Sequence, residues 1–167
     1  MYAVGTSVFH TGTGVCRVEN IGLSPLRRHG AQRYYKLRAL FSTSGECIYI
    51  PVDTAKSLRP LINRDEATNY LEQLPKLKSR PLAARKYMDL TSHYREMLAS
   101  GDPKSLLLLI KEIHLKEKEF SAHKKPLGRI DASYLRIAER LVCEEFAVAL
   151  QAEPESIKER LQSGILQ

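Results

Sequence analysis

The chain has 167 residues, of which 43% are hydrophobic. That is enough for one medium domain or two small ones with buried cores, and it excludes a wholly disordered protein. No apolar run approaches the roughly 20 residues that span a bilayer, so we expect no membrane contact. The net charge is +7, and residues 76–130 carry 13 Lys and Arg against 6 Asp and Glu. This basic segment predicts a polyanionic partner such as nucleic acid, although a merely solvated surface would have the same composition.

The first 50 residues have the pattern of a small β-structure. Their β-branched and aromatic residues occur in short runs, within residues 4–21, 34–40 and 47–50. Glycine-containing turns separate these runs, and residues 11–14 (TGTG) predict a hairpin turn rather than a nucleotide-binding loop. Four or five short strands joined by tight turns favour a small, strongly bent β-barrel.

A helical spacing of apolar residues follows the last of these runs. Asn63, followed by an acidic first turn, predicts the N-cap of a helix that ends near Gln73. The basic, Pro-bounded residues 75–81 predict a linker. We assign the barrel to residues 1–60 and the helical domain to residues 61–167.

Four further helices are predicted, over residues 82–99, 103–120, 131–150 and 156–161. Residues 100–103 (SGDP) end one helix and begin the next, because Gly suits the C′ position, Asp the N-cap and Pro the first turn. Asp131 is the expected N-cap of the fourth helix, and Gly164 is the expected stop of the last one. The predicted fold class is therefore α+β, a small β-barrel followed by an all-α helical bundle.

The sequence contains no motif typical of catalysis or of metal binding. It has no CxxC, HExxH or P-loop motif, and its five histidines show no metal-ligand spacing. Cys16, Cys47 and Cys143 are widely spaced and odd in number, which predicts reduced thiols, and the last two lie in apolar, core-like patterns. The N-terminus lacks the pattern of a secretory signal. We therefore expect a cytoplasmic protein that is not an enzyme and needs no metal or cofactor.

Short motifs spread along the chain follow one another in a recognisable order. They are residues 2–10 (YAVGTSVFH), 13–21 (TGVCRVENI), 34–37 (YYKL), 48–52 (IYIPV), 57–62 (SLRPLI), 100–102 (SGD) and the set Tyr134, Leu135, Ala138, Leu141 and Glu144. In this order they resemble the CarD/CdnL family of RNA polymerase-binding regulators over nearly the whole chain. The N-terminal barrel of that family is Tudor/SH3-like and is shared with transcription-repair coupling factors, whose helicase motor nothing here resembles.

The resemblance implies that the barrel binds the β subunit of bacterial RNA polymerase by aligning strand edges. Arg27 and Arg28, in the loop after the first run, fall at or next to contact positions of the family. So do Tyr49 and Pro51, in the last run. By residue type alone, Arg27 and Arg28 suit a turn as well as they suit a contact with polymerase. Tyr49 likewise suits a half-buried position in a strand.

The resemblance also implies that the helical domain contacts promoter DNA at the upstream edge of the bubble and modulates open-complex stability. The candidate phosphate-binding residues are Arg80, Arg85, Lys86, Lys124, Lys125 and Arg129. Many members place a Trp wedge near the start of the first C-terminal helix, but this chain has no Trp. Depending on register, Tyr87 or the stretch of residues 82–84 (LAA) occupies that place. At that place Tyr87 would act as the wedge, with a role in the helix core as the alternative. A lysine that members carry near the start of the later helix is replaced by Ala132 and Ser133.

The motifs together predict a monomeric, nucleoid-associated transcription regulator with two partners, the polymerase β subunit and promoter DNA. Two alternatives stay open. The missing Trp favours a module that binds polymerase without touching DNA, and the barrel is also compatible with an RNA- or ribosome-associated protein. No motif distinguishes activation from repression.

Overall fold

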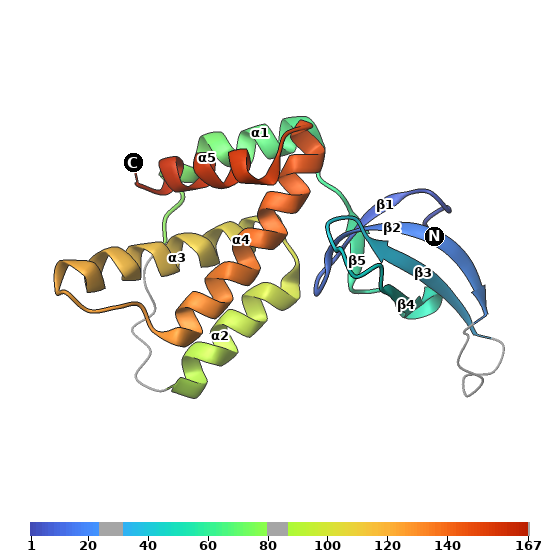
Figure 1. Ribbon diagram of the computed structural model, residues 1–167, viewed down its shortest axis with the longest axis horizontal. Helices are drawn as coiled ribbons and strands as arrows, with labels where there is room; N and C mark the ends of the chain where they lie inside the picture. The colour runs from blue at the N-terminus through green and yellow to red at the C-terminus, as the bar shows by residue number, and fades with distance from the viewer. Residues whose placement is uncertain (24–31, 80–86, 167) are drawn as a thin grey trace. The chain divides into compact units, whose positions relative to one another are not determined.

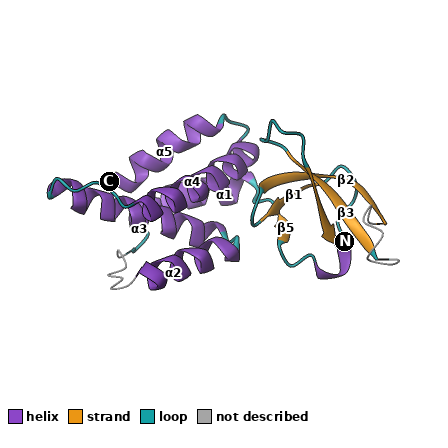
Figure 2. Ribbon diagram, turned by 60° about the horizontal axis from the view of Figure 1, so that its bottom comes forward, coloured by secondary structure: helices purple, strands orange, loops and turns teal. Residues whose placement is uncertain are grey.

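The computed structural model describes residues 1–23, 32–79 and 87–166, apart from the side chains of Tyr87, Met88 and Leu166 (Figure 1). Its contacts divide the chain into two compact units, Met1–Leu61 and Ile62–Gln167. The described strands all belong to the first unit and the described α-helices to the second (Figure 2). This succession is the α+β layout that the sequence predicts.

The N-terminal unit is a five-stranded sheet in the order β4-β3-β2-β1-β5. The strands are β1 (Ser7–His10), β2 (Gly14–Leu23), β3 (Arg33–Ala39), β4 (Cys47–Pro51) and β5 (Leu58–Pro60), and neighbouring strands are antiparallel. The sheet is open, because within the described residues β4 and β5 form its two edges and do not pair. The barrel expected from the sequence is therefore not closed: β5 has three residues and pairs with β1, and the 3-10 turn η2 (Val52–Thr54) separates it from β4.

A β-bulge in β2 decides which side chains enter the core of the sheet. The pairing with β3 shifts between Val18 and Asn20, so Glu19 is an extra residue on β2. Side chains alternate along a strand, and the extra residue lets both Val18 and Ile21 face the core. Glu19 and Asn20 are left outside it. The bulge thus places a carboxylate on the outer face of the sheet, opposite the core.

The described residues of the second unit form five α-helices and one short 3-10 turn. These are α1 (Arg64–Gln73), η3 (Leu74–Lys76), α2 (Tyr87–Ser100), α3 (Pro103–Ala122), α4 (Arg129–Leu150) and α5 (Pro154–Leu166). Helix α4 packs against each of the other four helices and is the centre of this unit (Figure 1). Its apolar stripe, which includes Ala138, Leu141 and Phe146, is buried as predicted. None of the described helices is long and apolar enough to cross a membrane.

Two helix starts lie where the sequence predicts them. At α1, Asn63 Oδ1 accepts a hydrogen bond from the Glu66 backbone N–H (2.9 Å) and Glu66 Oε2 accepts one from the Asn63 N–H (2.8 Å). At α3, Asp102 Oδ2 accepts from the Ser105 N–H (2.9 Å). Gly101 before it has a φ of +62°, a conformation that strongly favours glycine. These signals are local, and the structure confirms them.

The expected N-cap at Asp131 is wrong. Helix α4 begins at Arg129, its N-cap is Gly128, and Asp131 is a buried residue of the first turn with 3% of its surface exposed. Partners from other helices draw the carboxylate inward: Asp131 Oδ1 accepts hydrogen bonds from Tyr94 and Lys116. A Cβ at Gly128 would lie 3.0 Å from Asp131 Oδ2, so the cap position also leaves little room for a side chain.

Two other boundaries differ from expectation for reasons of packing. Helix α5 continues past Gly164, where a Cβ would lie 3.1 Å from the Leu74 side chain, so this glycine permits close packing and does not stop the helix. The segment expected as a linker begins inside the helical unit. Leu74 is 1% exposed, and the Lys111 ammonium donates to the carbonyls of Leu74 (2.8 Å) and Pro75 (3.1 Å).

Candidate functional site

The first candidate surface is the β4 edge of the N-terminal sheet. Among the described strands, none pairs with the outer side of β4. An edge strand presents a row of backbone N–H and C=O groups, which can pair with a strand of another protein. Tyr49 lies in the middle of β4, opposite Lys36 of β3, and 40% of its surface is exposed. An exposed aromatic residue on an unpaired edge is the kind of anchor that protein interfaces use.

A shallow hollow adjoins this edge on the outer face of β2, β3 and β4. It has a volume of about 260 Å³ and is lined by Asn20, Gly22, Leu23, Tyr34, Lys36 and Tyr49. Leu23 is 68% exposed. The lining therefore combines apolar and aromatic groups with one ammonium. It suits a partner segment that presents an apolar side chain with a carboxylate nearby.

An ion-pair cluster covers the same outer face beside the hollow. Glu19 bonds to the Arg38 guanidinium and to the Lys36 ammonium (3.2 Å), and the Cys47 thiol donates to it at 3.7 Å. The hydrogen bond from Arg38, aided by Lys36, lowers the pKa of Glu19 to about 2, so this carboxylate is charged at neutral pH. The cluster ties β2 to β3 and β4. It holds two cations against one anion, which leaves this face positively charged.

Of the predicted polymerase-binding residues, the structure brings Tyr49 and Pro51 together on one face of β4. Pro51 is half-buried at the end of that strand, opposite Tyr34. Arg27 and Arg28 lie outside the described residues. Sequence reasoning missed the contribution of Leu23 and Lys36 to the hollow, because it depends on the pairing of β2, β3 and β4.

The second candidate surface is the turn between α3 and α4. We call Lys124, Lys125 and Arg129 the basic turn; all three side chains are exposed. Lys124 has a φ of +55°, and its backbone N–H bonds to the Ser121 carbonyl (3.0 Å). The Lys125 N–H bonds to the Phe120 carbonyl (2.9 Å). These bonds close the C-terminal end of α3 and fix the backbone from which the lysines project.

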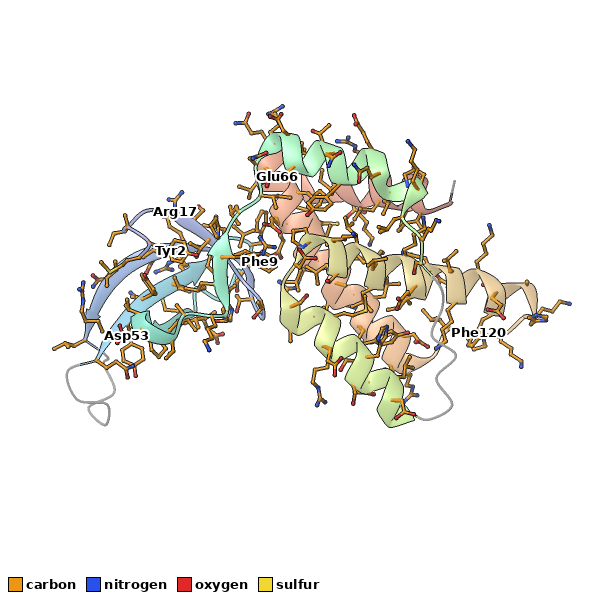
Figure 3. The ribbon with its side chains drawn as sticks, turned by 180° about the vertical axis from the view of Figure 1, so that it is seen from behind. Tyr2, Phe9, Arg17, Asp53, Glu66 and Phe120 are labelled. Carbon is orange, nitrogen blue, oxygen red and sulfur yellow. The ribbon has the colours of Figure 1, made fainter. Side chains whose placement is uncertain are left out.

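A buried polar network supports the basic turn. Asp131 Oδ1 accepts from the Tyr94 hydroxyl (2.8 Å) and from the Lys116 ammonium (2.9 Å), so residues of α2, α3 and α4 meet at one carboxylate. Burial, together with the hydrogen bond to Asp131, raises the pKa of Tyr94, which keeps the phenol protonated as a donor. Lys116 also lies over the ring of Phe120, 5.5 Å from its centroid, near the end of α3 (Figure 3).

Sequence reasoning did not find this network. Its members lie on three helices, with no spacing in the sequence that connects them. The other predicted DNA-binding residues are not placed: Arg80, Arg85 and Lys86 lie outside the described residues. Tyr87 is the first residue of α2, but its side chain is among those not described.

Two titratable groups of the helical unit, His114 and Cys143, have pKa values shifted by their surroundings. His114 bonds to Glu139 (3.0 Å) and Glu117 (3.2 Å); burial lowers its pKa, but the two carboxylates outweigh burial and raise it. Burial raises the pKa of the Cys143 thiol to about 12, so little thiolate forms at neutral pH. In the part of the chain that the structure describes, no three His, Cys, Asp or Glu residues form a group that could hold a metal ion.

Part of the chain matches a known family. Residues 2–62 match the family model of the CarD-like/TRCF RID domain, and no curated protein matches the chain. The matched segment coincides with the N-terminal sheet unit, including the β4 edge and the hollow beside it. CarD-like RID domains are interaction modules, and the match suggests a role in binding RNA polymerase. The N-terminal unit of this chain is a CarD-like/TRCF RID domain.

Proposed function

We propose that this chain is a bacterial transcription regulator that docks on the RNA polymerase β subunit through its N-terminal sheet. The observation that carries the proposal is the RID match over residues 2–62 together with the β4 edge, which presents Tyr49 and has no partner on its outer side among the described strands. A strand of the polymerase pairs with β4 and extends the sheet. The main-chain hydrogen bonds of such an added strand supply affinity, and side chains that enter adjoining pockets supply specificity.

The hollow beside β4 selects the partner strand. An apolar side chain of that strand enters between Leu23 and Tyr49, and Lys36 pairs with a carboxylate next to it. Glu19 already holds Lys36 in place, so its ammonium is oriented before binding, and less side-chain entropy is lost. Arg27 and Arg28 add cations to the same contact.

The helical unit, in this proposal, contacts promoter DNA next to the upstream edge of the bubble and modulates the stability of the open complex. The basic turn of Lys124, Lys125 and Arg129 binds phosphates, because its cations are exposed on a fixed backbone. Arg80, Arg85 and Lys86 add phosphate contacts, and Tyr87 stands in for the tryptophan wedge. The chain acts as a monomer in the nucleoid.

A binding assay of the full chain with the purified β lobe of RNA polymerase tests the first contact. We expect Tyr49→Asp to weaken binding by tenfold or more, because an interface hot spot contributes about 2 kcal/mol or more. Val4→Asp is the matched control, since Val4 is 58% exposed and precedes β1, which two strands separate from β4. A wild-type chain that does not bind the β lobe at moderate salt would refute the proposal.

A second candidate function is favoured by the absence of tryptophan: a module that binds polymerase without touching DNA. The triple variant Lys124→Glu, Lys125→Glu and Arg129→Glu separates the two. If the basic turn binds phosphates, this variant loses promoter affinity, and the slope of log affinity against log salt becomes shallower by about 3. An unchanged affinity and slope would favour the module without DNA contact.

A further inference from the structure

The exposed side of α4 carries a row of three arginines and one serine that begins at the basic turn. Arg129, Ser133, Arg136 and Arg140 follow one another at spacings of four, three and four residues, and all four are exposed. At about 100° per residue these positions fall within about 60° of one another around the helix. We call these four residues the α4 basic face. At a rise of about 1.5 Å per residue it extends for about 16 Å along the helix axis.

The acidic residues of α4 near this face are already engaged. The Glu144 carboxylate, 8% exposed, bonds to the Arg140 guanidinium at 3.3 Å. Glu139 bonds to His114 at 3.0 Å, and Asp131 is buried against Lys116. Among the described residues, the side chains of Arg129 and Arg136 form no ion pair with a carboxylate. The face therefore presents excess positive charge to its surroundings.

The opposite side of α4 holds this face rigidly. Ala138, Leu141 and Val142 are at most 1% exposed and pack in the core, so the helix cannot rotate without opening that core. The first turn is fixed further by the bonds from Tyr94 and Lys116 to Asp131. Cations at fixed intervals on a rigid helix lose little conformational freedom when they meet a regular array of charges.

The chemistry of the face favours a nucleic-acid backbone over an acidic protein. Protein interfaces have an apolar, desolvated centre, whereas the only exposed large apolar residue described on α4 is Ile137, at 37%. Duplex DNA carries about one negative charge per 1.7 Å of its axis, so a row about 16 Å long faces several phosphates. The hydroxyl of Ser133 adds a neutral hydrogen-bond donor between the cations.

We propose that the α4 basic face binds the phosphate backbone of duplex DNA, continuing the contact made by the basic turn. This inference rests on the proposed function and extends its DNA contact to Ser133, Arg136 and Arg140. Because these contacts reach phosphates and not base edges, they add affinity that depends on salt and not on sequence. The duplex lies along α4 and not only across its N-terminal end.

The test is a double variant with a matched control on another helix. Ser133→Glu with Arg136→Glu cancels the net positive charge of the face. Arg160→Glu with Ser163→Glu makes the same two changes at the same spacing on exposed positions of α5. Binding of each full chain to a promoter duplex is followed by fluorescence anisotropy between about 50 and about 200 mM salt. We expect the α4 variant to bind at least about tenfold more weakly, with a salt slope shallower by about 1, and the α5 variant to stay within about twofold of wild type.

The outcomes separate this inference from the proposed function. If wild type binds duplex DNA and the two double variants bind alike, the inference falls and the proposed DNA contact of the basic turn stands. If wild type binds no DNA, both fall. If the α4 variant loses affinity for the polymerase β lobe and keeps its affinity for DNA, the face is a protein interface and the inference is wrong. Should the double variant lack native helical circular dichroism, Arg136→Gln alone replaces it, with Arg160→Gln as its control.

Discussion

Replacing Asp131 with alanine is the sharpest test of the network beneath the basic turn. The side chains of Asp131 and Lys116 are 4% and 16% exposed, so the ion pair is almost fully removed from water. Asp131→Ala leaves the Lys116 ammonium and the Tyr94 hydroxyl without their acceptor. Breaking a buried pair by removing one partner costs about 3–5 kcal/mol, and we expect the free energy of unfolding to fall by that amount.

Two milder variants dissect this loss. Tyr94→Phe removes one hydrogen bond to a charged acceptor, which contributes about 1.5–3 kcal/mol. Asp131→Asn keeps an acceptor oxygen but removes the charge, so it should be less harmful than alanine. Because the hydroxyl of Tyr94 has no bond to lose once Asp131 is gone, the effects of Tyr94→Phe and Asp131→Ala should not add.

Urea unfolding followed by far-ultraviolet circular dichroism measures these losses, since the described α-helices all belong to the second unit. With a slope of about 2 kcal/mol per molar urea, a loss of 4 kcal/mol lowers the midpoint by about 2 M. Asp65→Ala is the control, because Asp65 is an exposed aspartate in the first turn of α1. An Asp131→Ala midpoint equal to that of Asp65→Ala would refute the network as a source of stability.

Three further predictions concern the core, the thiols and pH. Phe146→Ala should lower the free energy of unfolding by about 3–5 kcal/mol in the same assay, because Phe146 is 0% exposed; a loss below about 1 kcal/mol would contradict this. Alkylation with peptide mapping should label half-exposed Cys47 in the native protein and buried Cys143 only after unfolding, and equal rates would be inconsistent with the structure. The pKa of His114 is raised above 6.5, so the stability it contributes is complete below that pH and is lost as pH rises through the higher folded value. The urea midpoints at about pH 6 and about pH 8.5 should therefore differ more for wild type than for His114→Gln. The same difference in both proteins would show that His114 contributes no pH-dependent stability.

The helix boundaries that could be predicted from the sequence are those set by neighbouring residues. The caps at Asn63 and Asp102 depend on residues within three positions, so their signals are contiguous in the chain. Asp131 has the same local signal, an acidic residue at a helix start, and there the prediction failed. Two donors on other helices bind its carboxylate, and no local pattern reveals partners 15 and 37 residues away.

The candidate surfaces likewise contain some residues that a local motif reveals and others that only the tertiary structure brings together. Tyr49 and Pro51 could be predicted as a candidate contact because one strand motif carries the family resemblance, whereas the hollow beside them needs three strands in register and a bulge at Glu19. The composition of residues 4–50 predicts strands but does not say which strands pair. Whether a sheet closes depends on the lengths of its edge strands, and the three-residue β5 is too short for the sequence pattern to define.

The absence of a tryptophan wedge does not remove the proposed DNA contact, because the two proposed contacts are made by one chain. In the proposed complex, docking of the N-terminal unit on polymerase confines the helical unit near the promoter. For a short connection its effective concentration there is of the order of 1 mM. Non-specific binding to phosphates has dissociation constants of about 1–100 µM at physiological salt. A contact of that strength is weak in free solution but nearly saturated when tethered, so the basic turn and the α4 basic face need only modest affinity of their own.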